Sequence, residues 1–136
     1  MLKKNIYIAC SILFITSNTF AQKNDLLQGY WAMLPLNNGI ANVAYLDGKD
    51  TATLYPFECD FKNKTVSSPE PPEVSKYKIK NNSLYLLYPD EAANQTLVIK
   101  SLKKDQLVLE QTFLENYALT YTYQKVEGIK NLCPTA

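Results

Sequence analysis

The sequence contains no histidine and no arginine, so two side chains that are common in enzyme and phosphate-binding sites are missing. Without histidine there is no imidazole general base, no Ser-His or Cys-His pair and no imidazole ligand for a metal. All 14 basic residues are lysines, so the planar guanidinium group that binds phosphate in a bidentate manner is also missing. These absences favour a non-enzymatic protein and argue against nucleic-acid binding.

Glycine and cysteine are scarce as well. With four glycines there is no glycine-rich phosphate loop. Two of the three cysteines, Cys59 and Cys133, are far apart and do not have the spacing of zinc ligands. The 14 basic and 13 acidic residues nearly balance, which leaves no electrostatic footprint for nucleic acid or anionic lipid. We therefore expect no catalytic residue, no metal and no cofactor.

The first 21 residues have the three parts of a secretory signal peptide. Lys3 and Lys4 form a basic start, an apolar run covers residues 6–15, and Thr19 and Ala21 are small enough for a signal peptidase site. The run is shorter than the roughly 20 residues that span a bilayer, although a retained short anchor is the alternative. The sequence predicts a cleaved leader over 1–21 and an exported domain over 22–136, periplasmic or secreted, with no membrane span after cleavage.

Cys59 and Cys133 are the cysteines that remain after cleavage. In an oxidising compartment an even pair predicts one disulfide, and two free thiols are the alternative. The bond would hold the C-terminal tail, residues 128–136, against the domain. That tail contains Pro134 and little periodicity, so it would otherwise fray.

Eight short segments rich in Tyr, Thr, Val, Ile and Leu alternate with turn sequences, which is typical of strands joined by hairpins. In residues 75–80 the lysines share one face, while Tyr77 and Ile79 share the other. Such alternation indicates antiparallel sheet with one buried face. The sequence also allows one helical turn at 24–28 and a short additional strand at 60–62. The eight predicted strands cover residues 28–34, 40–46, 51–57, 74–80, 83–88, 95–102, 106–113 and 118–126.

Eight short strands in one small domain are best accommodated by a closed barrel. Closure removes the unpaired edges that an open sheet would expose. The predicted fold is therefore all-β, a single antiparallel up-and-down β-barrel. A two-sheet β-sandwich is the alternative.

The segment Gly29-Tyr30-Trp31 resembles the Gly-x-Trp signature on the first strand of lipocalins and small bacterial lipocalin-like domains. The hairpin segments 77–84 and 105–110 and the last strand, 122–126, follow the layout of those domains, so the resemblance covers about 26–127. It implies a β-barrel in which Gly29 and Trp31 are structural. The chain departs from the family in being shorter and in lacking the final helix and the arginine that usually packs on the tryptophan.

Tyrosine is the unusual component of the composition, because only Tyr7 of the ten tyrosines lies in the leader. Tyrosine combines an apolar ring with a polar tip and is enriched at binding surfaces. The other interpretation is that tyrosine is a strong strand former that fills a small core. We predict a small apolar or amphipathic ligand at the barrel mouth, held by five tyrosines: Tyr45, Tyr55, Tyr77, Tyr121 and Tyr123.

The loop at residues 67–73 supports an alternative function. Its three prolines stiffen the backbone, and Glu70 and Glu73 make it acidic. Such a loop could bind a protein partner, as in an immunity or inhibitor protein that neutralises an envelope-acting enzyme or toxin. The other interpretation is a stiff connector between strands. The sequence gives no indication of the oligomeric state.

Overall fold

The computed structural model describes residues 18–67 and 70–133. In this part of the chain, strands account for most of the residues, and the fold is all-β as predicted. The elements are α1 (Asn18–Leu27), β1 (Gly29–Met33), β2 (Ile40–Leu46), β3 (Thr51–Asp60), β4 (Thr65–Ser67), β5 (Glu73–Lys80), β6 (Ser83–Leu87), the short 3-10 helix η1 (Glu91–Ala93), β7 (Gln95–Leu102), β8 (Gln106–Leu114) and β9 (Tyr117–Val126).

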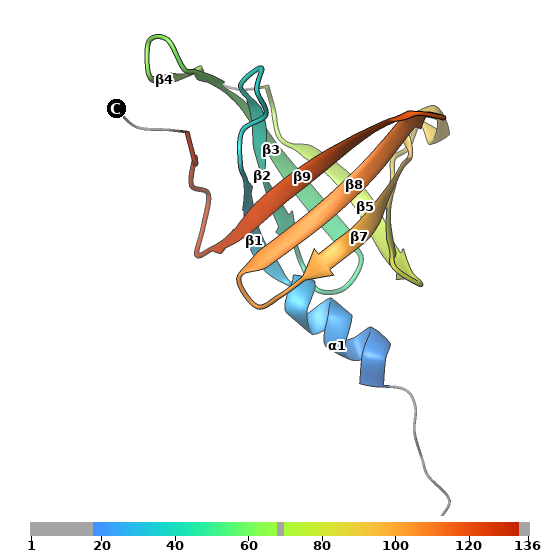
Figure 1. Cartoon of the computed structure of the whole chain (residues 1–136). Coiled ribbons are helices and arrows are strands. Elements are labelled where there is room, and N and C mark those ends of the chain that lie inside the picture. The colour runs from blue at the N-terminus through green and yellow to red at the C-terminus, as the bar shows by residue number, and fades with distance from the viewer. Residues whose placement is uncertain (1–17, 68–69, 134–136) are drawn as a thin grey trace, which may run out of the picture.

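The strands form one closed antiparallel barrel (Figure 1). Eight strands follow each other around the wall in chain order, and β9 pairs back with β1, where Trp31 lies opposite Lys125. β4 is outside this wall, because it pairs only with the far end of β3. The closed pairing confirms the predicted up-and-down barrel and excludes the β-sandwich.

Alternation along the strands divides the side chains between the inside and the outside of the barrel. Trp31 and Met33 on β1 point inward and are almost fully buried. The main core fills the interior and consists of Leu27, Trp31, Met33, Leu46, Ala52, Tyr77, Leu84, Leu86, Leu97, Leu107, Leu109 and Tyr123.

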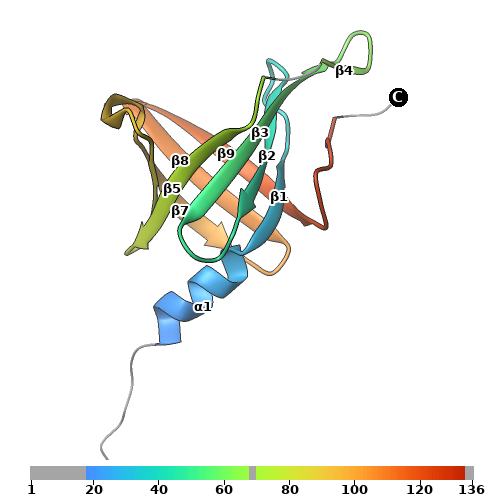
Figure 2. The ribbon, with the colours of Figure 1, turned by 180° about the vertical axis from the view of Figure 1, so that it is seen from behind.

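The helix α1 lies at one end of the barrel and extends away from it toward its N-terminus (Figure 2). Leu27 is completely buried, and its carbonyl accepts a hydrogen bond of 2.7 Å from the indole N–H of Trp31. Lys23 Nζ donates to Asn82 Oδ1 at 2.6 Å and so ties the helix to the turn between β5 and β6. The helix is longer than the single predicted turn, and together with Trp31 it forms the floor of the barrel.

Lys125 on β9 completes this floor. Its Nζ lies 4.4 Å from the centroid of the Trp31 ring, which is a cation–π contact, and donates to the carbonyls of Leu26 and Gln28. Burial lowers the pKa of Lys125. Gly29 has a φ of +116°, and a Cβ there would lie 3.0 Å from Lys125 Nζ. Lys125 therefore packs on the tryptophan where the sequence offers no arginine, and Gly29 leaves room for it.

A second, smaller cluster lies on the outside of the barrel and is called the outer cluster here. Its buried members are Ala32, Ala41, Val43, Phe57 and Cys59, and Leu132 and Cys133 of the tail pack against them. The predicted disulfide joins Cys59 to Cys133, with the Cα atoms 5.6 Å apart. The tail up to Cys133 is therefore held against β3, and residues 134–136 lie outside the described residues.

The predicted strand at 60–62 is wrong. β3 continues to Asp60, whose Oδ1 accepts hydrogen bonds of 2.9 Å from the backbone N–H groups of Lys62 and Asn63. Lys64 has a positive φ of 56°. The carboxylate thus stabilises a turn at this point, and the additional strand is β4, which follows the turn.

The predicted leader lies outside the described residues, apart from residues 18–21. Because α1 begins at Asn18, cleavage after Ala21 would remove the first turn of the helix and keep Lys23 and Leu27. None of the described helices has the length and apolar character needed to cross a membrane. The disulfide indicates an oxidising, extracytoplasmic compartment.

Candidate functional site

The end of the barrel opposite α1 contains a pocket of about 350 Å³, called the mouth pocket here. This volume is at the small end of the range for ligand sites, roughly 300–1,000 Å³. The lining comes from seven of the eight wall strands: Ile40, Ala41, Asn42, Leu54, Pro56, Glu73, Leu86, Gln95, Leu97, Gln111, Phe113, Tyr121 and Tyr123.

Apolar side chains form most of the wall of the mouth pocket. Leu86 on β6 and Leu97 on β7 are buried and belong to the main core. Leu54 and Pro56 contribute from β3, on the strand face that points inward with Ala52. The pocket therefore continues the hydrophobic interior outward to the open end of the barrel.

A few polar groups face this apolar wall. The hydroxyl of Tyr121 donates a 3.0 Å hydrogen bond to Gln111 Oε1. Asn42 donates from Nδ2 to the sulfur of Met33 at 3.4 Å, while its Oδ1 is buried without a hydrogen-bond partner. An unpaired buried acceptor costs roughly 1–3 kcal/mol. Asn42 thus lines the mouth pocket and carries a buried acceptor that no described group pairs.

Tyr123 lies between the core and the mouth pocket and is 7% exposed. Burial raises its pKa to about 12, although the neighbouring Asn42 side chain acts in the opposite direction. Burial also raises the pKa of Tyr121. Both phenols therefore stay neutral near pH 7 and are suited to packing and hydrogen bonding rather than to nucleophilic attack.

Glu73 is the one charged side chain among the described residues that line the mouth pocket. It begins β5, lies opposite Leu54 of β3 and is exposed. The ion pairs found in the described part of the chain join Lys76 to Asp50 and Lys100 to Glu110, and Glu73 takes part in neither. Its carboxylate is thus free to meet a ligand at the edge of the pocket.

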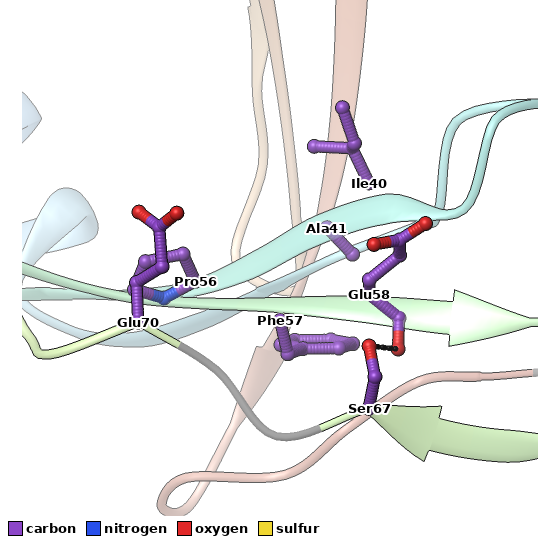
Figure 3. A pocket seen from close by; sticks show the side chains of 7 residues that line it. All are labelled: Ile40, Ala41, Pro56, Phe57, Glu58, Ser67 and Glu70. Atoms are coloured by element: carbon purple, nitrogen blue, oxygen red, sulfur yellow. Dashed lines mark hydrogen bonds between the residues drawn. The ribbon is translucent and has the colours of Figure 1, made fainter.

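A second pocket of about 430 Å³ adjoins the mouth pocket and is called the rim pocket here (Figure 3). Both pockets share Ile40, Ala41 and Pro56. Figure 3 shows the carboxylates of Glu58 and Glu70 on the same side of β3, while the hydroxyl of Ser67 donates to the Glu58 carbonyl at 3.2 Å. The rim pocket therefore adds two carboxylates beside the barrel mouth.

The structure separates the five tyrosines of the sequence prediction. Tyr121 and Tyr123 line the mouth pocket. Tyr77 lies deeper in the core, where burial and the nearby Asp47 carboxylate raise its pKa. Tyr45 and Tyr55 lie on the outer face: Tyr45 stacks on Tyr30 with the ring centroids 4.5 Å apart, and Tyr55 packs against the outer cluster.

The two predicted partner-binding glutamates line two adjoining pockets. Glu73 faces the mouth pocket, and Glu70 lines the rim pocket. Sequence reasoning missed Asn42 and Gln111 as pocket residues. Alternation along β8 could have identified Gln111, because it shares the inward face with Leu107 and Leu109. Alternation could not identify Asn42, because apolar residues precede and follow it on β2.

No cluster of three or more metal-binding side chains occurs within residues 18–67 and 70–133. Comparison with known proteins gives no further guide to the site, because no protein-family model, curated protein or solved structure matches the chain. The fold class is a closed eight-stranded antiparallel barrel with one extra strand outside.

Proposed function

We propose that this protein is an exported, non-enzymatic binding protein that holds a small apolar or amphipathic molecule in the mouth pocket. The observation that carries the proposal is a pocket of about 350 Å³ with an apolar wall and an unpaired buried acceptor, Asn42 Oδ1. An eight-stranded barrel is just wide enough to hold one small ligand. The apolar wall would bind the body of the ligand, and Asn42 would orient its polar group.

A relationship to lipocalin-like domains is part of this proposal. The up-and-down strand order and the closed floor support it. The local geometry of the Gly29-x-Trp31 segment supports it further, because a positive φ at Gly29 admits the Lys125 ammonium onto the Trp31 ring.

A periplasmic or secreted location without enzymatic activity completes the proposal. The leader sequence and the Cys59–Cys133 disulfide support export. The lack of histidine supports a binding role over catalysis, as does the raised pKa of Tyr123.

Filling the mouth pocket tests the proposal. Leu97→Trp should fill part of the pocket with an indole ring, which is larger than the leucine side chain. The affinity for an environment-sensitive apolar dye should then fall by at least about tenfold. Thr96→Trp is the matched control, because Thr96 is the exposed neighbour on the same strand. Dye affinity is measured by fluorescence titration, and thermal unfolding checks that both variants fold. Equal dye affinity in the two variants, or no dye binding to the parent protein, would exclude the mouth pocket as a ligand site.

The extension of β3 and β4 beyond the barrel favours a second candidate function. Phe61 and Val66 on this extension are 43% and 41% exposed, and Glu70 follows it in the chain. Apolar and acidic groups together suit a protein partner with a basic surface, such as an envelope enzyme or toxin that this protein inhibits. Capture of such a partner should be lost with Glu70→Lys plus Glu73→Lys and kept with Glu115→Lys, as judged by pull-down. A partner held equally by all variants would rule out the acidic loop.

A further inference from the structure

We infer that the molecule held in the mouth pocket is an amphipathic cation, with an ammonium group attached to an apolar body. This inference rests on the proposed function and names its ligand class. It comes from three features of the barrel mouth: its one charged lining residue, its unpaired acceptor, and the distribution of charge between the two ends of the barrel.

The charged residue in the lining determines which sign of ligand charge the pocket favours. Within residues 18–67 and 70–133, Glu73 lines the pocket without an ion-pair partner, and the other lining residues are apolar or neutral. A cation in the pocket would pair with this exposed carboxylate while its apolar body packs on the apolar wall. An anion in the same place would be repelled by Glu73.

The buried polar atom of the lining that has no partner among the described residues, Asn42 Oδ1, is a hydrogen-bond acceptor. Asn42 Oδ1 lacks a hydrogen-bond partner, and Gln111 Oε1 accepts from Tyr121. An ammonium group has only N–H donors and no acceptor, so it can satisfy oxygen acceptors. A carboxylate ligand has only acceptors and would leave Asn42 Oδ1 unpaired.

Charge is also distributed unevenly along the barrel axis. At the mouth end, Glu58 and Glu70 line the adjoining rim pocket. At the floor end, lysines and carboxylates lie together on α1 and on the hairpin turns around it. The lysines include Lys23, Lys49, Lys80, Lys103 and Lys104, and most of their charge is offset by Asp25, Asp47, Asp50 and Asp105. The described mouth-end lysines Lys62 and Lys64 lie on the turn that joins β3 to β4, outside the barrel wall. The mouth is therefore the more acidic end of the barrel, and its field attracts cations.

Three probes with the same apolar chain test the inference: octylamine, octanol and octanoate, titrated calorimetrically at pH 7 and low salt. The amine is protonated at this pH. We expect octylamine to bind most tightly and octanoate most weakly. Glu73→Gln should weaken octylamine binding by roughly tenfold and leave octanol unchanged. Glu115→Gln is the control, since Glu115 is an exposed carboxylate at the same end that does not line the mouth pocket.

The outcomes separate this inference from the proposed function. If none of the three probes binds, both the proposed ligand-binding function and the preference for cations are refuted. If octanol or octanoate binds as tightly as octylamine, the mouth pocket still holds apolar molecules, but the preference for cations is refuted. An octylamine affinity that survives Glu73→Gln, or falls equally with Glu115→Gln, refutes the pairing with Glu73. A loss confined to Glu73→Gln supports it.

Discussion

Removing the Cys59–Cys133 disulfide should cost the protein a large part of its stability. The bond closes a loop with a sequence separation of 74 residues. In the chain-entropy model, a loop of this length restricts the unfolded state by about 4 kcal/mol. Single domains are stable by only about 5–15 kcal/mol. Replacing both cysteines by alanine should therefore bring the domain close to its unfolding threshold.

Loss of the bond also releases the tail from the outer cluster. Leu132 would no longer pack there, and Val43 and Phe57 would gain exposure. Leu132→Ala in the oxidised protein isolates this packing contribution. It should lower the free energy of unfolding by about 1 kcal/mol, because the side chain is only partly buried.

Urea unfolding followed by circular dichroism measures both effects. The double alanine variant should lose about 4 kcal/mol, and reduction of the parent protein should give the same value. A loss below about 1 kcal/mol would refute the loop-closure argument. A loss in Leu132→Ala as large as that in the double variant would show that packing, and not the covalent bond, holds the tail.

Three further predictions concern the floor and the core. Leu27→Ala should lower the free energy of unfolding by about 2–5 kcal/mol because Leu27 is completely buried; a loss below 1 kcal/mol in urea unfolding would contradict its role in the floor. Gly29→Ala should cost about 1–3 kcal/mol, since φ is +116° and the new Cβ would lie 3.0 Å from Lys125 Nζ; an unchanged thermal midpoint would contradict this. Tyr123 has a pKa of about 12 when folded and about 10 when unfolded, so the unfolded state loses its proton first as pH rises. Its contribution of about 3 kcal/mol is complete below pH 10 and is lost between pH 10 and 12. Tyr123→Phe should therefore reduce the fall in the free energy of unfolding over that pH range, and an equal fall in both proteins would contradict the assignment.

Much of the wall of the barrel could be predicted from alternation in the sequence. The inward face of β8, with Leu107 and Leu109, and that of β9, with Tyr121 and Tyr123, follow directly from the period of two. Closure followed from the number of short strands and the need to pair their edges. The turn after Asp60 was not predicted, because residues 60–62 continue a strand-like sequence. The strand ends there because the Asp60 carboxylate accepts hydrogen bonds from the backbone N–H groups of Lys62 and Asn63.

The candidate site was harder to predict, because β1 to β3 are covered on both faces. Alternation correctly places Tyr55 and Leu54 on opposite faces of β3, but it does not say which of the two faces lies inside the barrel. The tail decides this, since it turns the outer side of these strands into a second core. That cover depends on a contact between residues 74 positions apart, which no local pattern encodes. Asn42 was not predicted as a pocket residue because β2 is likewise covered on both faces.

The floor built by α1, Trp31 and Lys125 makes the barrel a cup rather than a tube. If the mouth pocket holds a ligand as proposed, that molecule would leave by the way it entered. Loading and unloading would then occur at one opening and could not proceed at the same time. Whatever supplies the ligand and whatever receives it would compete for the same rim of strand ends, around Glu73 and Phe113.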